Sequence, residues 1–193
     1  MKRQFIFLDN FGVIYEEIAP FVLRDVYGEE LGAKIKNTYF PGLDLGERTL
    51  EEGLKEIVET YGGSFEDLQM RWKKQTKIRK GFAQFLANVP SSIHLVLVSN
   101  APIGVIESMY EENGLASKFD GIFSSSVFHL GKPSKEFFDL VEERLGITKE
   151  DQILFADDNP KNLEAGKARG YETFLVENEG SLIDLEKEIL RRA

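Results

Sequence analysis

The sequence predicts an α/β fold: a doubly wound parallel sheet with a helical insertion after its first strand. Short apolar runs recur along the chain without the polar alternation of half-exposed strands, which is typical of parallel strands covered on both faces. Helical patterns separate most of these runs, and one long segment near the N-terminus contains helical patterns alone. The runs that we interpret as strands are residues 4–9, 93–98, 121–125, 152–156 and 172–176.

The helices predicted between these strands have recognisable ends. Pro102 suits a first helical turn, and Ser134 is placed to cap the helix that follows it. Gly114, Gly146 and Gly170 come just after predicted helices, where a left-handed residue often ends a helix. Strand–helix alternation of this kind gives right-handed crossovers and an open, doubly wound sheet. The predicted helices are residues 102–113, 134–145, 160–169 and 181–191.

Residues 15–80 form the helical insertion and divide the chain into two predicted domains. Thr49 and Glu52 have the spacing of a capping box that opens the second helix of this insertion. The helical patterns are at about 17–40, 49–61 and 64–79, with Pro41-Gly42 and Gly62-Gly63 between them. We therefore predict an α/β core of residues 1–14 plus 81–193 and a helical cap of residues 15–80, which lies over the C-terminal end of the first strand.

The composition disfavours several kinds of partner and site. The 193-residue chain carries a formal net charge of -9, which argues against nucleic-acid and anionic-membrane partners because both surfaces are negative. It contains no Cys, which rules out disulfides, thiolate metal sites and a Cys nucleophile. The apolar run after Gln4 stops at Asp9 and is too short for a secretory signal, so we expect a cytoplasmic protein. Nothing in the sequence indicates an oligomeric state.

Polar side chains stand at the C-terminal ends of three predicted strands and in one loop. In a doubly wound sheet, ligands bind outside these strand ends, so we expect the side chains to converge on one pocket. The positions are Asp9 after the first strand, Ser99 and Asn100 after the second, Lys132 in the loop 131–133, and Asp157 and Asp158 after the fourth. Each alone also fits an ordinary role as a turn acid, a helix cap or a solvated lysine. Their joint order and placement favour a functional site.

These side chains are the parts of a magnesium-assisted phosphoryl-transfer site. An ionised Asp9 can attack phosphorus and form an aspartyl-phosphate, which water then hydrolyses. Because a carboxylate repels a phosphate dianion, the site needs positive charge, which Lys132 and a Mg²⁺ bridging Asp9 and Asp158 would supply. The Ser99 hydroxyl, with Asn100 beside it and the backbone N–H groups of the next helix, can hold the remaining phosphate oxygens.

The order of these motifs resembles that of the haloacid dehalogenase superfamily of hydrolases, most of whose members are phosphatases. The resemblance covers residues 5–13, 95–100, 131–133 and 153–166, and the insertion falls where the family carries its first-type cap. It implies that Asp9 is the nucleophile and a Mg²⁺ ligand, and that Ser99 and Lys132 bind phosphate and take part in catalysis. It also implies that Asp158 ligates the metal and that Asp157 supports it from the outer shell.

Phe11 is where the chain departs most from that family. Family phosphatases usually have an Asp two residues after the nucleophile. Its carboxyl protonates the leaving group and then activates water, while its backbone carbonyl binds Mg²⁺. Phe11 therefore retains the carbonyl ligand but lacks the general acid–base, a loss of roughly 10²–10⁴ in rate. Asn10 cannot substitute, because an amide does not exchange a proton at neutral pH. Glu16, Glu17 or a cap acid such as Glu47 could take over this role if it reaches the site.

Three interpretations remain open. The first is a Mg²⁺-dependent phosphatase that acts on a small phosphorylated metabolite. The second is a 2-haloacid dehalogenase, because that branch has Tyr two residues after its nucleophile and Phe11 is also aromatic. That reaction needs no metal, however, and Asp157 and Asp158 fit poorly beside a carboxylate substrate. The third is a catalytically impaired protein that binds a phosphorylated ligand or acts as a scaffold. Metal dependence separates the first from the second, and turnover separates the first from the third.

Substrate specificity is expected to lie in the cap. We predict that residues 40–48 contact the substrate. Arg48 in this segment could meet an anionic group on it, although the simpler interpretation of this residue is a solvated loop arginine. Trp72 follows Leu68 at helical spacing, and we interpret the pair as packing within the cap. In the core, Asn162 stands where many members of the family have a further acid.

If Phe11 leaves the site without a proton donor, hydrolysis should depend strongly on the leaving group. An aryl or acyl phosphate, whose leaving group needs little protonation, should be hydrolysed far faster than a sugar phosphate. The kcat/KM values for p-nitrophenyl phosphate and for a set of sugar phosphates measure this dependence. Equal turnover of both would show that another group supplies the proton.

Overall fold

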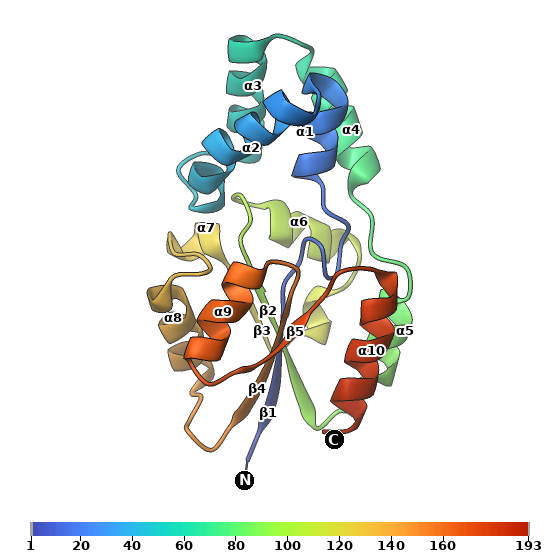
Figure 1. The fold of residues 1–193 in the computed structure, drawn as a ribbon, viewed down its shortest axis with the longest axis vertical. Coiled ribbons are helices and arrows are strands. Elements are labelled where there is room, and N and C mark those ends of the chain that lie inside the picture. Colours follow the sequence, from blue (N-terminus) through green and yellow to red (C-terminus); the bar gives the residue numbers. More distant parts are fainter. Residues whose placement is uncertain (1, 193) are drawn as a thin grey trace.

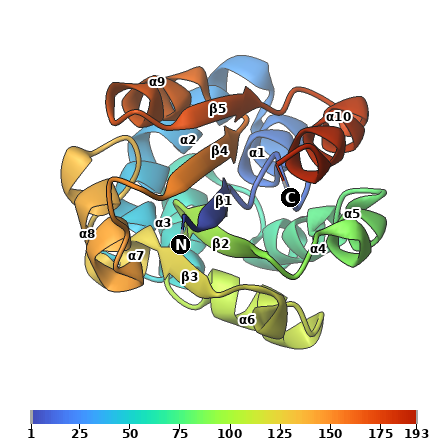
Figure 2. The ribbon, with the colours of Figure 1, turned by 90° about the horizontal axis from the view of Figure 1, so that it is seen from below.

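The strands are β1 (Gln4–Leu8), β2 (Ile93–Ser99), β3 (Gly121–Ser124), β4 (Gln152–Asp157) and β5 (Glu172–Leu175). In this computed structural model, which describes residues 2–192, they form one five-stranded parallel sheet in the order β3-β2-β1-β4-β5 (Figures 1 and 2). The α/β fold predicted from the sequence is therefore confirmed, and each predicted strand is present within a residue of its expected end.

β1 is the central strand, and its position decides where the polar strand ends meet. Leu8 pairs with Leu97 of β2 on one side and with Ala156 of β4 on the other. The chain winds from β1 toward β3 and then crosses back to β4, so the C-terminal end of β1 lies at the topological switch point. Asp9 continues the line of the strand, because its backbone N–H donates to the Ala156 carbonyl at 3.0 Å.

Helices cover both faces of the sheet and its C-terminal edge. In chain order they are α1 (Ala19–Tyr27), α2 (Glu29–Asp44), α3 (Leu50–Tyr61), α4 (Phe65–Gln75), α5 (Phe82–Asn88), α6 (Val105–Glu112), the 3₁₀ turn η1 (Ala116–Lys118), α7 (Ser125–Phe128), α8 (Lys135–Leu145), α9 (Pro160–Ala168) and α10 (Glu179–Leu190). We term α1–α4 the cap helices, because they lie beyond the C-terminal ends of the strands (Figure 1). None of the helices in the described part of the chain is both long and apolar enough to cross a bilayer.

Alternate side chains of β1 enter two hydrophobic clusters on opposite faces of the sheet. Phe5 and Phe7 lie in a cluster with buried residues of α8 and α9. Ile6 and Leu8 lie in a larger cluster that includes residues of α5, α6 and α10 and continues into the cap helices. Both faces of β1 are therefore buried, which explains why the strand reads as a continuous apolar run.

The first cap segment differs from the single helix predicted at about 17–40. It forms two helices that meet at Gly28, whose φ of 82° is in the region that favours glycine. The second of them, α2, continues past the predicted stop, with Pro41 inside it, and ends at Asp44. Buried Phe40 and Leu43 on either side of Pro41 explain how packing overrides the proline. The extra turn brings Asp44 to the end of the helix.

The helix predicted to begin at Pro102 begins later. The structure has Gly104, with a φ of 74°, as the residue before α6, and Pro102 lies in the loop after β2. Its carbonyl accepts a hydrogen bond from the Val105 N–H at 3.2 Å, so it forms a turn that leads into the helix. The short helices α5 and α7 were not predicted. The predicted caps at Thr49 and Ser134 are confirmed.

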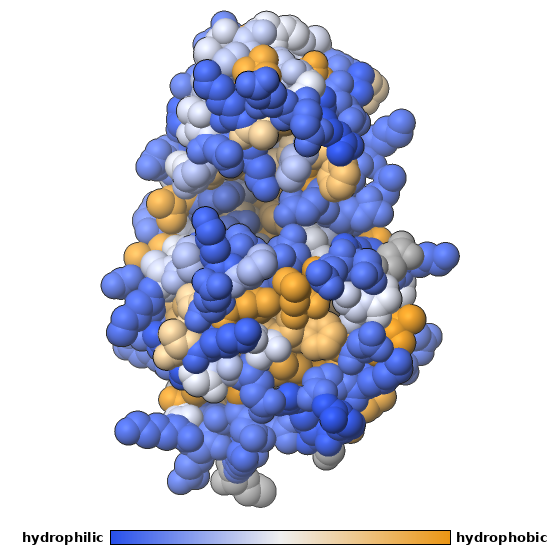
Figure 3. Space-filling model, viewed as in Figure 1, coloured by the Kyte–Doolittle hydropathy of each residue, from blue (hydrophilic) through white to orange (hydrophobic). Residues whose placement is uncertain are grey.

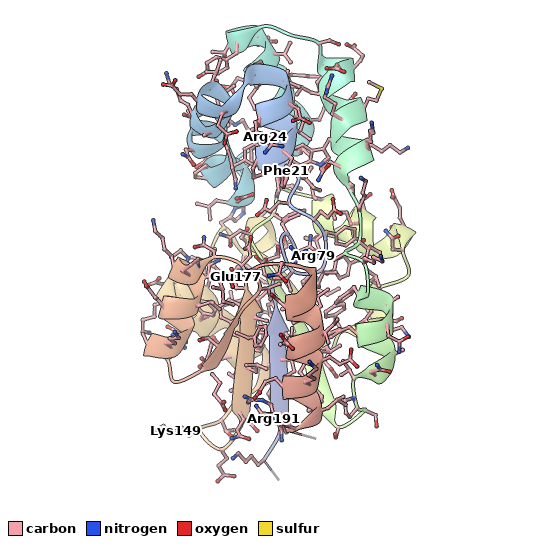
Figure 4. The ribbon with its side chains drawn as sticks, turned by 45° about the vertical axis from the view of Figure 1, so that its right-hand side comes forward. Phe21, Arg24, Arg79, Lys149, Glu177 and Arg191 are labelled. Atoms are coloured by element: carbon pink, nitrogen blue, oxygen red, sulfur yellow. The ribbon has the colours of Figure 1, made fainter. Side chains whose placement is uncertain are left out.

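Two antiparallel linkers connect the cap helices to the core. Tyr15 pairs with Ile78, the Arg79 N–H donates to the Ile14 carbonyl at 2.8 Å, and the Glu16 N–H donates to the Lys77 carbonyl at 2.9 Å. The Arg79 side chain lies at this junction, near the segment that carries Glu177 (Figure 4). The division into a core of 1–14 plus 81–193 and a cap of 15–80 stays a prediction, since no measurement of independent folding tests it.

An ion pair between Arg3 and Asp151 ties the start of β1 to the segment before β4, and it should make stability depend on acid. The Asp151 carboxylate accepts from the Arg3 side chain at 2.7 Å and from the Thr148 N–H at 2.8 Å. These bonds, with that of the Arg3 guanidinium first, hold the pKa of Asp151 well below its usual value. The stabilisation is complete above the ordinary carboxyl pKa of about 4 and is lost as the pH falls toward the lowered pKa.

Replacement of Asp151 by Asn should therefore lower Tm by several degrees at pH 7, and the difference from the wild type should shrink below about pH 4. Thermal unfolding of both proteins between pH 2 and pH 8 measures this. Glu150→Gln, next to it but exposed, is the matched control and should behave as the wild type. A difference that stays constant across the pH range would contradict the assignment.

Candidate active site

A cavity of about 170 Å³ lies between the C-terminal ends of the strands and the cap helices. Figure 3 shows the surface recessed at the level where these two parts of the molecule meet. From the core, the cavity is lined by Asp9, Phe11, Asn100, Lys132 and Asp158, which come from four separate predicted motifs. The expected convergence of the strand-end side chains on one pocket therefore agrees with the geometry.

The Lys132 ammonium is the electrostatic centre of this cavity. It is buried, and its Nζ lies 2.8 Å from Asp9 Oδ1 and 2.6 Å from Asp157 Oδ2. Burial opposes the charge of Lys132, but the two carboxylates more than offset that effect and hold its pKa above the ordinary value. Lys132 therefore remains an ammonium and fixes the separation of the two acids.

Asn100 holds the backbone of Lys132 in place. Its side-chain N–H donates to the Lys132 carbonyl at 2.8 Å, and its Oδ1 accepts from the Lys132 N–H at 2.8 Å. A Cβ on the preceding Gly131 would lie 2.9 Å from Asn100 Oδ1, so only glycine allows this close pairing. Asn100 was predicted to bind phosphate. In the structure its side chain positions Lys132, and Asn100 also lines the cavity.

Asp157 is fully buried behind Lys132. Its Oδ1 accepts from the Asn159 N–H at 2.8 Å, and both carboxylate oxygens accept from the Asn162 side chain at 3.1 Å. An acid at position 162 would repel this carboxylate, whereas the amide satisfies it. The departure at Asn162 is therefore compatible with an intact site, because the amide fills the hydrogen-bonding capacity of Asp157 while this carboxylate holds Lys132.

Asp9 and Asp158 present the carboxyl oxygens that border the cavity. Burial raises the pKa of Asp9 well above its usual value, although Lys132 opposes the shift. Burial, together with the charge of Glu17, raises the pKa of Asp158 to about 7. A Cβ on Gly12 would lie 2.2 Å from Asp158 Oδ2, so the glycine makes room for this carboxyl group.

The donor set fits a magnesium ion. Carboxylate oxygens from Asp9, Asp157 and Asp158 lie within 4.8 Å of one another. Oxygen ligands of this kind are those that Mg²⁺ prefers. Burial is the largest cause of the raised pKa of Asp9 and Asp158, and the charge of neighbouring carboxylates adds to it. Lys132 supplies one positive charge against the three acids of the cluster, which leaves a shortage of positive charge. A divalent cation at the cavity edge would remove it.

Ser99 and Phe11 are placed differently from one another. Ser99 is fully buried at the end of β2, and its Oγ lies 3.4 Å from the Asn100 carbonyl oxygen. Ser99 does not line the cavity, although its neighbour Asn100 does. Phe11 is half-buried and lines the cavity directly. The side chain at this position offers the cavity an apolar surface and no proton.

The cap contributes a stripe of side chains from one helix. Lys36, Phe40 and Asp44 recur at a spacing of four on α2, so they share a helix face, and all three line the cavity. Trp72 of α4 also lines it and stacks on Phe40 with ring centroids 5.8 Å apart. The sequence analysis did not single out Lys36, and it included Asp44 only as part of a predicted loop at 40–48, because it ended the first helical pattern at about residue 40 and so did not place the three residues on one helix face. The spacing itself was the signal that would have found them.

Arg48, which was considered as a contact for an anionic group, lies outside the lining of the cavity. Its guanidinium forms an ion pair with Glu56 of α3. Within the predicted segment 40–48, Phe40 and Asp44 line the cavity. Trp72 packs within the cap, as expected, but it faces the cavity as well.

Comparisons with known proteins agree with this architecture. The family model described as "Hydrolase: haloacid dehalogenase-like hydrolase" matches residues 5–170. Haloacetate dehalogenase H-2 from Moraxella sp. (strain B) is 28% identical over 92 residues, or 48% of this chain and 41% of that protein. The match therefore spans about two fifths of the relative's length.

Solved structures resemble nearly the whole chain. A predicted HAD-like family hydrolase from Porphyromonas gingivalis is similar with a TM-score of 0.78 and 21% identity, over 99% of this chain and 98% of that one. A HAD family enzyme from Bacteroides thetaiotaomicron, in complex with magnesium and inorganic phosphate, has a TM-score of 0.71 and 20% identity, over 90% and 93%. L-2-haloacid dehalogenase from Xanthobacter autotrophicus has a TM-score of 0.61 and 21% identity, over 90% and 76%. At these identities the likeness shows a shared fold.

Magnesium should stabilise the protein through Asp158. At a Mg²⁺ concentration about 100 times Kd, linkage predicts a rise in Tm of roughly 5–10 °C for a chain of this size. Asp158→Asn should remove most of this rise and, because it relieves repulsion among acids, should not lower Tm in the absence of metal. Differential scanning calorimetry with and without Mg²⁺ measures both effects.

Glu164→Gln, on the exposed face of α9, is the matched control for that experiment and should respond to Mg²⁺ as the wild type does. An equal Mg²⁺-dependent rise in the wild type and in Asp158→Asn would mean that the ion binds elsewhere.

Proposed function

This chain belongs to the haloacid dehalogenase-like hydrolases, and we propose that it is a Mg²⁺-dependent phosphatase. The substrate would be a small phosphorylated metabolite, attacked by Asp9 to form an aspartyl-phosphate. One observation carries this proposal: Lys132 lies 2.8 Å from Asp9, inside a cluster of three acids that borders a small cavity. A nucleophilic carboxylate, a fixed ammonium and a place for a divalent cation are what phosphoryl transfer requires.

The balance of charge at the cavity supports a metal-dependent reaction. Four acids line it, namely Asp9, Glu17, Asp44 and Asp158, against two cations, Lys36 of α2 and Lys132, and Lys132 is already shared between two carboxylates. An anionic substrate would be repelled from this site without a further cation. Mg²⁺, held by Asp9, Asp158 and the backbone carbonyl of Phe11, would supply the positive charge that a phosphate dianion needs beside a carboxylate.

The residues of the chain have separable roles in this proposal. An oxygen of Asp9 attacks phosphorus, and Lys132 stabilises the negative charge of the phosphoryl oxygens as they pass between donor and acceptor. Asn100 and Asp157 hold Lys132 from its backbone and from its ammonium. The cap helices close the cavity on the side away from the sheet and exclude bulk water from it.

A haloacid dehalogenase is the second candidate. The aromatic side chain of Phe11 at the cavity, and the similarity to Moraxella haloacetate dehalogenase over part of the chain, favour it. Displacement of a halide needs no proton donor, which suits a site without an acid at position 11. The cluster of Asp9, Asp157 and Asp158 argues against it, because a carboxylate substrate would meet the same repulsion without a metal to relieve it.

Hydrolysis of p-nitrophenyl phosphate with and without Mg²⁺ tests the proposal. We expect turnover that requires Mg²⁺ and that Asp9→Asn abolishes, because the amide cannot attack phosphorus. Release of halide from chloroacetate or 2-chloropropionate, independent of Mg²⁺ and lost in the same variant, would instead establish a dehalogenase. Stabilisation by phosphate together with Mg²⁺, without turnover of either kind of substrate, would establish a binding role.

A further inference from the structure

We propose that the carboxyl group of Asp44, at the end of cap helix α2, is the general acid–base that the chain lacks at Phe11. Proton transfer would then come from the cap, whereas the nucleophile comes from the core. This inference rests on the proposed phosphatase function. It follows from the position of Asp44 in the cavity, from the contacts that hold it there, and from its burial.

Asp44 lies on the side of the cavity where a leaving group would depart. In phosphoryl transfer the attacking and leaving oxygens are roughly in line with phosphorus between them. Asp9 attacks from the end of β1, so the leaving oxygen points away from the sheet and toward the cap helices (Figure 1). Asp44 borders the same cavity as Asp9 and belongs to those helices. Water that attacks the aspartyl-phosphate must enter along this same line, so one group can serve both steps.

Hydrogen bonds to the core hold Asp44 in place. Its backbone carbonyl accepts a hydrogen bond from the Ser125 hydroxyl, which in turn accepts from the Ala101 N–H at 3.0 Å. The next carbonyl, of Leu45, pairs with His129 Nδ1 at 2.8 Å. Gly46 then packs so closely on the core that a Cβ there would lie 2.6 Å from the Ser126 carbonyl. The end of α2 is therefore docked on α7 and on the residue that follows it, a short distance before Lys132 in the chain.

The surroundings of Asp44 suit a group that must both give and take a proton. Burial raises the pKa of its carboxyl to about 7, with Lys36 and Lys132 opposing the shift and Glu17 adding to it. Lys36 lies on the same helix, Glu17 comes from the segment before α1, and Lys132 comes from the core. A general acid–base is most effective when its pKa lies near the working pH.

Glu17 is the other acid that lines the cavity from outside the sheet, and its position suits it less. After burial, its charge is the largest cause of the raised pKa of Asp158, which places Glu17 beside the proposed metal ligand. Its backbone carbonyl accepts from the Gln75 side chain at 3.1 Å, which ties this segment to α4. The backbone of Asp44 is instead held on the core, because its carbonyl accepts the hydrogen bond from Ser125, and the charges of Glu17 and Lys132 both act on its carboxyl group.

The proposed reaction balances in two steps. In the first, an Asp9 oxygen bonds to phosphorus, the bond from phosphorus to the ester oxygen breaks, and the Asp44 proton passes to that oxygen to give the free alcohol. In the second, water bonds to phosphorus and gives a proton to the Asp44 carboxylate. The bond from phosphorus to Asp9 then breaks, which releases inorganic phosphate and restores both side chains.

Kinetics of Asp44→Asn on esters with different leaving groups test the inference. The wild type should hydrolyse alkyl and aryl phosphates with similar kcat/KM, so the dependence expected from Phe11 alone should be weak. Asp44→Asn should lose roughly 10²–10⁴ in kcat/KM on an alkyl phosphate and stay within about tenfold of the wild type on p-nitrophenyl phosphate. Because water activation is lost as well, this variant should show a burst of about one nitrophenolate per active site. Asp44→Glu should recover part of the alkyl activity.

Matched variants separate this role from a structural one. Glu30→Gln, which changes an exposed acid at the opposite end of α2, should leave every rate unchanged. Phe11→Asp introduced into Asp44→Asn should restore turnover of the alkyl ester. Equal loss on both substrates, or the burst pattern in Glu17→Gln in place of Asp44→Asn, would overturn the inference and leave the proposed function standing. A wild type without any phosphatase activity would overturn both.

Discussion

The arrangement of the site depends on one buried ammonium held between two carboxylates. Removing an ion from water costs several kcal/mol even in real proteins, and the cost is recovered only where partners and hydrogen bonds are well placed. Lys132 meets this condition through Asp9 and Asp157, at 2.8 and 2.6 Å. The partners are themselves satisfied, since Asp157 accepts from Asn162 and Asn100 pairs with the Lys132 backbone. Removal of any one member would leave a charge or an amide unpaired in the interior.

The contacts of Lys132 with Asp9 and Asp157 also depend on the order of the strands in the sheet. Asp9 must stand beside both the loop that carries Lys132 and the end of β4, which requires β1 at the centre of the sheet. Parallel pairing then brings all the strand ends to one edge. Glycines at Gly12 and Gly131 allow side chains from other motifs to approach within contact distance of the backbone. Each short motif of the sequence therefore combines a strand end, a polar side chain or a glycine that this arrangement requires.

Sequence reasoning succeeded where the signal is local and failed where it is not. The buried strands and the capping box at Thr49 follow from apolar runs and residue spacing, and the structure contains them. The end of α2 was misplaced because Pro41 is a local stop signal, whereas Phe40 and Leu43 are held by contacts across the cap. Arg48 was a plausible anion-binding residue, but its partner Glu56 lies on another helix and no local pattern identifies it.

The role proposed for Asp44 could not be identified from the sequence, because it too depends on a contact between distant parts of the chain. Asp44 is docked by Ser125, 81 positions further along the chain, and no spacing rule connects the two. With proton transfer assigned to Asp44, the lifetime of the aspartyl-phosphate depends on whether the end of α2 is docked. A site with an acid at position 11 would carry the nucleophile and the acid on one segment of the core. In this chain, by contrast, Asp9 would be freed of phosphate only while the cap is closed over it.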